Sequence, residues 1–321
     1  MRHFDVFNGD ADGLCALHQL RLKQPVDSIL ITGVKRDINL LRKVDAGTGD
    51  RVTVLDISMD KNKEGLEQLL GNNVSVIYFD HHYPGESLPK HLNLDAYIDT
   101  SPEVCTSLLV NDFINGQFLP WAVTAAFGDN LPCAARNAAK QLDYSESQLE
   151  TLCELGICLN YNGYGPTVED LYFHPASLYE KIKPYSSPFD FVNNEEAYQV
   201  LRTGYYEDIA NAEKIAPEFS NDSVSLYILP DEKWARRVSG VYGNQLSTSV
   251  PDNAHAILTI LPEGGYQVSV RAPQTNKTGA DELCRSFSSG GGRKGAAGIN
   301  LLPEEDLELF IQRFQQQYQK N

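Results

Sequence analysis

The first 80 residues alternate between short β-prone runs and helical segments, and this alternation constrains the fold more than any other feature. The expected elements are strands at 4–7, 28–32, 51–56 and 74–79 and helices at 14–22 and 61–70. Strands that alternate with helices pair in parallel, with helices on both faces of the sheet. The sequence therefore predicts an α/β fold with a doubly wound, mainly parallel N-terminal sheet.

Acidic residues and histidines follow these strands. They are Asp10 and Asp12 in a Gly-Asp-Ala-Asp-Gly turn, Asp56 after the third strand, and Asp80, His81 and His82 after the fourth; a further Gly-Asp turn at Asp129 follows an apolar helix. The carboxyl ends of parallel strands lie at one edge of the sheet, where open α/β sheets bind their ligands. These side chains are expected to meet there.

Carboxylates gathered in one crevice repel one another unless cations lie between them. Oxygen and imidazole ligands without thiolate favour manganese, and magnesium, cobalt and iron are the alternatives. The set is large enough for two ions about 3.5–4 Å apart, an arrangement that suits phosphoryl displacement. Taken singly, each motif has a plainer reading: Asp-x-Asp-Gly is often only a turn, and a strand-terminal aspartate such as Asp56 is often a helix N-cap.

The composition indicates the cellular compartment and the kinds of binding partner to expect. No apolar run approaches the length of a membrane-spanning helix, and the six cysteines are scattered rather than paired as in a disulfide framework. We therefore expect a cytoplasmic protein with no membrane partner. The net charge of −16 disfavours binding of long duplex nucleic acid. A small nucleotide substrate, captured locally, is the expected partner, and a homodimer is left open.

A long polar helix at 194–216 separates two regions of different composition. The region after it contains expected strands at 223–229, 254–261 and 267–271 and a helix at 304–317. We expect an N-terminal domain at 1–190, a linker helix at 191–220 and a smaller C-terminal α/β domain at 221–321.

The C-terminal region contains a second group of functional candidates. Gly290, Gly291 and Gly292 precede Arg293, and Arg271 ends an expected strand. Consecutive glycines allow backbone N–H groups to approach an anion closely, and guanidinium groups bind phosphate. We interpret these five residues as a phosphate-binding site, although a structural turn would also explain the glycines.

The ordered set of motifs resembles motifs I to IV of the DHH phosphoesterase family, of the RecJ and nanoRNase-like group. The motifs are Asp10-x-Asp12-Gly13, Asp56, Asp80-His81-His82 and Gly128-Asp129, and Gly290–Gly292 with Ala296-Ala297-Gly298 resembles the family's DHH-associated substrate domain. The resemblance implies a two-manganese phosphohydrolase, with a catalytic domain at 1–190, a substrate-binding domain at 221–321 and a cleft between them. It implies Asp10, Asp12, Asp56, His81 and Asp129 as metal ligands, and catalytic roles for Asp80 and His82.

Two positions depart from the family pattern. Val6 stands where many members have a histidine, and Arg293 stands where the family has a histidine after three glycines. The first change removes one metal ligand. The second replaces an imidazole with a permanently charged guanidinium, which favours capture of a terminal phosphate.

From these features we expect a manganese-dependent phosphodiesterase that hydrolyses very short nucleotides, such as linear 5′-phosphorylated dinucleotides of the pGpG type, to mononucleotides. The enzyme alternatives are a RecJ-like single-strand exonuclease, a cyclic-dinucleotide phosphodiesterase and a phosphatase for nucleotide bisphosphates or polyphosphate. The alternative from another class is a nucleotide-binding sensor without turnover, which Val6 and Arg293 would favour.

Overall fold

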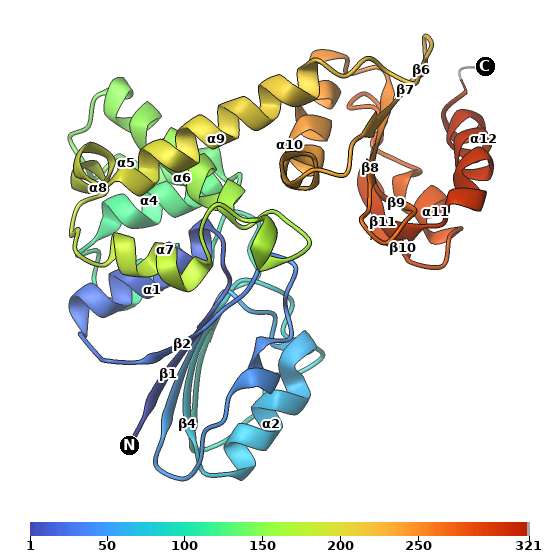
Figure 1. Cartoon of the computed structure of the whole chain (residues 1–321). Helices are drawn as coiled ribbons and strands as arrows, with labels where there is room; N and C mark the ends of the chain where they lie inside the picture. The colour runs from blue at the N-terminus through green and yellow to red at the C-terminus, as the bar shows by residue number, and fades with distance from the viewer. Residues whose placement is uncertain (320–321) are drawn as a thin grey trace. The chain divides into compact units, whose positions relative to one another are not determined.

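A computed structural model describes residues 1–319 of the chain (Figure 1). The chain forms two compact units, the first comprising residues 1–205 and the second beginning at Tyr206. Helix α9 (Glu196–Glu213) contains the boundary between the units. No helix in the described part of the chain is both long enough and apolar enough to cross a membrane.

The first unit is built on a five-stranded sheet in which all neighbouring strands are parallel, in the order β2-β1-β3-β4-β5. Its elements are β1 (His3–Phe7), α1 (Ala11–Lys23), β2 (Ile29–Ile31), β3 (Arg51–Leu55), α2 (Lys63–Gly71), β4 (Ser75–Asp80), β5 (Leu94–Ile98), α3 (Thr106–Phe113), α4 (Leu119–Gly128), α5 (Pro132–Ala139), α6 (Glu146–Asn162), α7 (Pro175–Ile182) and α8 (Pro188–Asn194). The predicted doubly wound parallel sheet is confirmed.

Side chains of alternate residues on the strands enter two separate apolar cores, because successive residues of a strand point to opposite faces of the sheet. Phe7, Leu55 and Phe79 pack against α1, α4 and α6, the larger core of this unit. Val54 and Tyr78 pack on the other face, against α2. Figure 1 shows α1 and α2 on opposite sides of this sheet. This packing fixes the strand ends from which the polar motifs emerge.

The second unit contains a six-stranded mixed sheet in the order β10-β11-β9-β8-β7-β6. Its elements are β6 (Phe219–Ser220), β7 (Val224–Leu229), α10 (Lys233–Ser249), β8 (Ala254–Ile260), β9 (Tyr266–Arg271), α11 (Ala280–Arg285), β10 (Gly290–Arg293), β11 (Ala296–Leu302) and α12 (Leu307–Tyr318). One face packs against α11 and α12 and the other against α10. A second α/β unit, as the sequence predicts, is present.

A buried histidine joins α1 to the segment after α7. The Nε2 of His18 donates to the carbonyl oxygen of Tyr185 at 2.7 Å, because a carbonyl can only accept, and the imidazole packs edge-on against Trp121. Burial lowers the pKa of His18 to about 4, although the bond to the Tyr185 carbonyl opposes this effect. The imidazole is therefore neutral in the folded protein at neutral pH.

We predict that His18 makes folding sensitive to mild acid. Its pKa is about 4 in the folded chain and 6.5 in the unfolded one. The contribution of neutral His18 to the unfolding free energy is therefore complete above pH 6.5 and declines as the pH falls toward 4. The loss amounts to about 3 kcal/mol of unfolding free energy. A His18→Gln variant keeps the donor to Tyr185 but cannot titrate. Chemical denaturation from pH 7 to pH 4 should show a shallower loss for this variant, and an equal loss in both proteins would contradict the assignment.

Candidate metal centre

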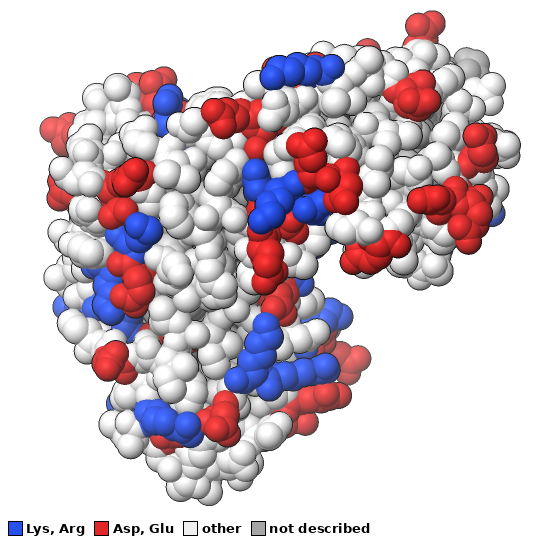
Figure 2. Space-filling view, viewed as in Figure 1, with Lys and Arg blue, Asp and Glu red and all other residues white. Residues whose placement is uncertain are grey.

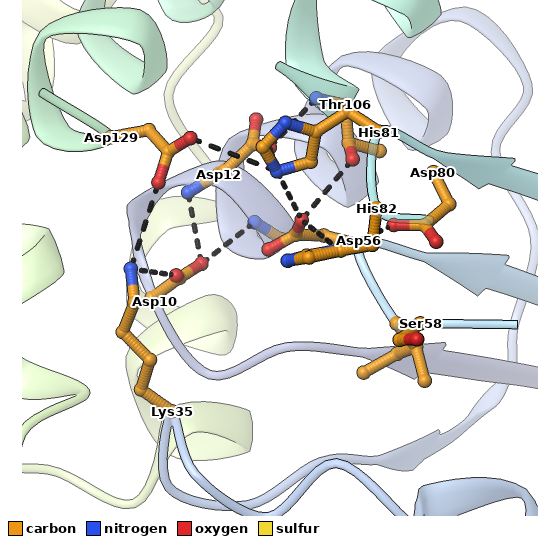
Figure 3. Close-up of polar contacts among 12 residues, drawn as sticks. Asp10, Asp12, Lys35, Asp56, Ser58, Asp80, His81, His82, Thr106 and Asp129 are labelled. Carbon is orange, nitrogen blue, oxygen red and sulfur yellow. Dashed lines mark hydrogen bonds and ion pairs between the residues drawn. The ribbon is translucent and has the colours of Figure 1, made fainter. Parts of the chain in front are cut away.

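The polar residues that follow the parallel strands meet at one edge of the sheet, as Figure 3 shows. The structure brings together the predicted residues of the first unit, namely Asp10, Asp12, Asp56, Asp80, His81, His82 and Asp129. Asp10 and Asp12 stand at the start of α1, Asp56 follows β3, Asp80 ends β4, and Asp129 follows α4.

Asp10 and Asp12 are both engaged by backbone N–H groups. One oxygen of Asp10 accepts from the N–H groups of Asp12 and Gly13 at 3.1 Å, so this carboxylate caps α1. The two oxygens of Asp12 accept from the N–H groups of Thr106 and Ser107, each at 2.7 Å. Asp12 therefore caps α3, a helix more than 90 residues downstream, and its carboxylate is held rigidly in the site.

Asp56 adopts a left-handed backbone conformation, with φ of 59°, at the point where the chain leaves the sheet. Such a φ is uncommon outside glycine and is often found at functional sites. The backbone N–H of Asp56 donates to the carbonyl of Phe79, and Thr106 Oγ1 donates to the carboxylate at 3.2 Å. These bonds direct the carboxylate of Asp56 toward the other acidic side chains.

His81 places one ring nitrogen among three carboxylates. Its Nδ1 donates to the carbonyl of Val104 at 2.9 Å, which leaves Nε2 facing the site. Nε2 lies 3.3 Å from a carboxylate oxygen of Asp56, 3.7 Å from Asp129 and 3.9 Å from Asp12. A metal-binding histidine is held in this way, with one nitrogen fixed by a carbonyl and the other free to coordinate.

His82 and Asp80 form a separate pair beside this cluster. Nδ1 of His82 lies 2.7 Å from Oδ1 of Asp80, and the imidazole is 43% exposed, so its other nitrogen can reach a substrate. Asp80 is fully buried, and its Oδ2 has no hydrogen-bond partner in the described part of the chain. The buried carboxylate therefore fixes the orientation of the His82 ring.

Lys35, which belongs to none of the sequence motifs, also reaches the centre. Its Nζ lies 2.6 Å from Asp10 Oδ2 and 3.7 Å from Asp129 Oδ1. It sits in the loop after β2, and a position at the carboxyl end of a parallel strand was the signal that could have identified it. Figure 3 shows its side chain directed at these two carboxylates.

Crowding of the carboxylates shifts their pKa values. Burial raises the pKa of Asp56 well above its usual range, and the charges of Asp10 and Asp12 raise it further. Burial and the charge of Asp12 also raise the pKa of Asp129, to about 6. The pKa of Asp10 is lowered instead, because the charge and hydrogen bond of Lys35 outweigh the effect of burial.

His81 responds to the same carboxylates. Burial lowers the pKa of the imidazole, but the hydrogen bond with Asp56 and the charges of Asp12, Asp56 and Asp129 outweigh burial and raise the pKa to about 10. At neutral pH, with no metal ion bound, the imidazole of His81 therefore carries a second proton. A divalent ion that coordinates Nε2 of His81 must displace this proton.

The donor set fits a divalent cation. Two groups of side chains each have ligand atoms within 4.8 Å of one another. One group consists of Asp12, His81 and Asp129, and the other consists of Asp56, His81 and His82. Carboxylate oxygens with imidazole nitrogen suit manganese or magnesium, and the charge of an ion would relieve the repulsion described above. His81 belongs to both groups, Asp12 and Asp129 to one and Asp56 to the other, whereas Asp10 belongs to neither.

The predicted phosphate-binding residues lie in the second unit. Arg271 ends β9, and its guanidinium donates to Asn244, to Ser269 and to the carbonyl of Gly240 at 2.7–3.0 Å. Arg293 ends β10 and is exposed, with no ion pair in the described residues. Ala296 of β11 is the register partner of both arginines, so the two guanidiniums project from the same face of the sheet on either side of a small residue.

The glycines of β10 have a packing role that the sequence could not indicate. A Cβ at Gly290 would lie 1.7 Å from the carbonyl oxygen of Cys284, and one at Gly292 would lie 2.4 Å from Ala297. A Cβ at Gly291 would meet nothing within 4 Å. Two of the three glycines are therefore required by close packing, and Gly291 is not.

We predict that Mn²⁺ stabilises the folded protein through Asp56. An ion at 100 times its dissociation constant adds about 2.7 kcal/mol to the unfolding free energy. Asp56→Asn should abolish most of this gain without destabilising the metal-free protein, because it removes one of the repelling carboxylates. Denaturation of each protein in chelator and in Mn²⁺ measures both quantities.

Asp50→Asn is the matched control, since Asp50 precedes the same strand at its other end. Its carboxylate accepts from Arg2 and from the N–H of Gly47, so the variant should lose stability but keep the gain from Mn²⁺. A gain in Asp56→Asn as large as that of the parent would rule out Asp56 as a ligand.

Sequence and structure comparisons differ in what they find. No protein-family model and no curated protein matches the sequence. Three solved structures each match 98% of this chain. Exonuclease RecJ bound to manganese has a TM-score of 0.66 and 15% identity, with 89% of its own chain covered. The DHH domain of a member of a family of ribosomal proteins has a TM-score of 0.64, 12% identity and 86% coverage, and the pGpG-specific phosphodiesterase PggH of Vibrio cholerae has a TM-score of 0.56, 13% identity and 99% coverage. The chain therefore has the fold of RecJ and the DHH-domain proteins, which its sequence motifs resemble.

Proposed function

We propose that this protein is a manganese-dependent phosphodiesterase of the DHH type that hydrolyses very short nucleotides, with linear 5′-phosphorylated dinucleotides as its substrates. The observation that carries the proposal is the position of His81 Nε2, within 3.9 Å of carboxylate oxygens from Asp12, Asp56 and Asp129. Structures with the same fold include RecJ bound to manganese and a pGpG-specific phosphodiesterase, which supports both the metal and the substrate class.

Asp12, Asp56, His81 and Asp129 would hold the metal. When bound, a divalent ion supplies positive charge that polarises a phosphoryl oxygen and makes water a better nucleophile. His82 stands beside this position with Asp80 behind it. Asp80 holds the ring of His82 in place, and the outward nitrogen would donate a proton to the leaving oxygen of the scissile phosphate.

The charge distribution favours a small substrate. The chain has a net charge of −16, and on the face drawn in Figure 2 Lys and Arg occur in small groups beside Asp and Glu rather than as one broad basic surface. A long polyanion would meet repulsion over much of such a surface. A dinucleotide needs only local positive charge, which Arg271 and Arg293 would supply to its 5′-phosphate.

We predict that the purified protein with Mn²⁺ converts 5′-phosphorylated dinucleotides to mononucleotides faster than it shortens longer oligonucleotides or opens cyclic dinucleotides. A panel of these substrates, with nucleotide bisphosphates and polyphosphate added, measures the preference by chromatography of the products. His81→Ala should abolish turnover. Intact dinucleotides beside a cleaved oligonucleotide or an opened cyclic dinucleotide would contradict the proposal.

We predict further that Arg293→Gln raises KM for a 5′-phosphorylated dinucleotide about tenfold, the effect of losing about 1.4 kcal/mol of charge-assisted hydrogen bonding, with little change in kcat. The same variant should lose the preference for a 5′-phosphate over a 5′-hydroxyl. Arg313→Gln is the control, because Arg313 is not among the proposed phosphate-binding residues. It lies on α12, where its guanidinium packs against the ring of Phe287. Unchanged KM in Arg293→Gln would remove Arg293 from the substrate site.

A further inference from the structure

Lys35 is a cation built into the candidate metal centre. Its Nζ donates to Asn160 Oδ1 at 3.0 Å and pairs with Asp10 Oδ2 at 2.6 Å, and Asp129 Oδ1 lies 3.7 Å away (Figure 3). The side chain is only 26% exposed. An ammonium group with three polar neighbours in this position carries one positive charge into a cluster of carboxylates.

The backbone holds Lys35 in place. Its N–H donates to the carbonyl of Gly163 at 2.8 Å, at the end of α6. The loop that leads to Lys35 packs directly on the Asp-x-Asp turn, since a Cβ at Gly9 would lie 2.0 Å from the carbonyl oxygen of Gly33. The ring of Tyr164 lies 5.9 Å from Nζ and adds a cation–π contact. Lys35 is therefore a fixed part of the site rather than a mobile surface lysine.

The contacts of Asp10 leave it little capacity for a metal ion. One of its oxygens accepts two backbone N–H groups, and the other pairs with Lys35. Within residues 1–319, neither group of side chains that could hold an ion includes Asp10. Val6, four residues earlier, is fully buried and apolar, so it offers no ligand near Asp10.

Both groups that could hold an ion depend on His81. Its Nδ1 is bound to the carbonyl of Val104, so a single nitrogen is available to coordinate, and one imidazole nitrogen binds one ion. The two groups therefore compete for the same nitrogen of His81, and Asp10, the carboxylate outside both groups, is already paired with Lys35.

We propose that the ammonium group of Lys35 takes the place of a second divalent cation, so that the centre binds one metal ion tightly, at His81 and its carboxylates. The motifs imply two metal ions, and Lys35 fills the position of the second ion. Lys35 thus acts as a positioning residue that fixes Asp10 and Asp129. This role rests on the proposed function for the bound metal, but it concerns the number of ions and not the reaction.

Metal stoichiometry tests the proposal without an activity assay. Mn²⁺ is titrated into metal-free protein by calorimetry, and the bound ions are examined by electron paramagnetic resonance, in which two neighbouring Mn²⁺ ions give an exchange-coupled spectrum. The parent should bind one ion tightly and show the spectrum of isolated Mn²⁺. Lys35→Met should bind a second ion at least tenfold more tightly than the parent does and show the coupled spectrum, because Asp10 and Asp129 lose their resident cation.

Lys43→Met is the matched control, since Lys43 pairs with Asp37 at the same distance of 2.6 Å but outside the centre, and it should behave as the parent does. Lys35→Arg keeps the charge and should bind one ion. Two results would overturn the role of Lys35 and leave the proposed function standing. One is a parent protein that binds two ions with equal affinity, and the other is a Lys35→Met variant that still binds only one ion. A parent that binds no Mn²⁺ overturns both.

Discussion

Electrostatic repulsion among carboxylates is the constraint on which the candidate site depends. Asp10, Asp12 and Asp56 are almost completely buried and converge at one edge of a parallel sheet. Nothing in an apolar core would favour this arrangement, because unpaired buried charges are expensive. It persists because two sheet faces pack tightly enough to fix the strand ends, and because Lys35, protons and a divalent ion can share the neutralisation of the cluster.

The sequence predicts this part of the molecule well, for a physical reason. Strands β1, β3 and β4 are short and largely apolar, and a polar residue ends each of them or follows directly. Asp56 and Asp80 therefore had to meet the turn at Asp10 and Asp12 once the strands paired in parallel. Asp129, which follows a helix rather than a strand, joins them because α4 packs against α1. The order of strands in the sheet did not need to be known for this prediction.

Other features depend on contacts that a sequence does not display. The edge strand β5 carries alternating polar residues, and α10 contains Gly240 and Gly243, so neither stands out as a regular element. The capping of α3 by Asp12 joins positions more than 90 residues apart. The approach of Lys35 to Asp10 arises from packing of the loop at Gly33 on Gly9, which no local pattern reveals. The packing needs of Gly290 and Gly292 likewise arise from the fold.

We propose that the chain holds a divalent ion at His81 Nε2 among Asp12, Asp56 and Asp129. Anomalous diffraction from crystals grown with Mn²⁺, recorded on both sides of the manganese absorption edge, locates the ion directly. We predict one strong peak in coordinating contact with His81 Nε2 and with carboxylate oxygens of Asp56, with the Nζ of Lys35 still beside Asp10. A peak at another part of the chain, or a centre without any peak at saturating Mn²⁺, would contradict it.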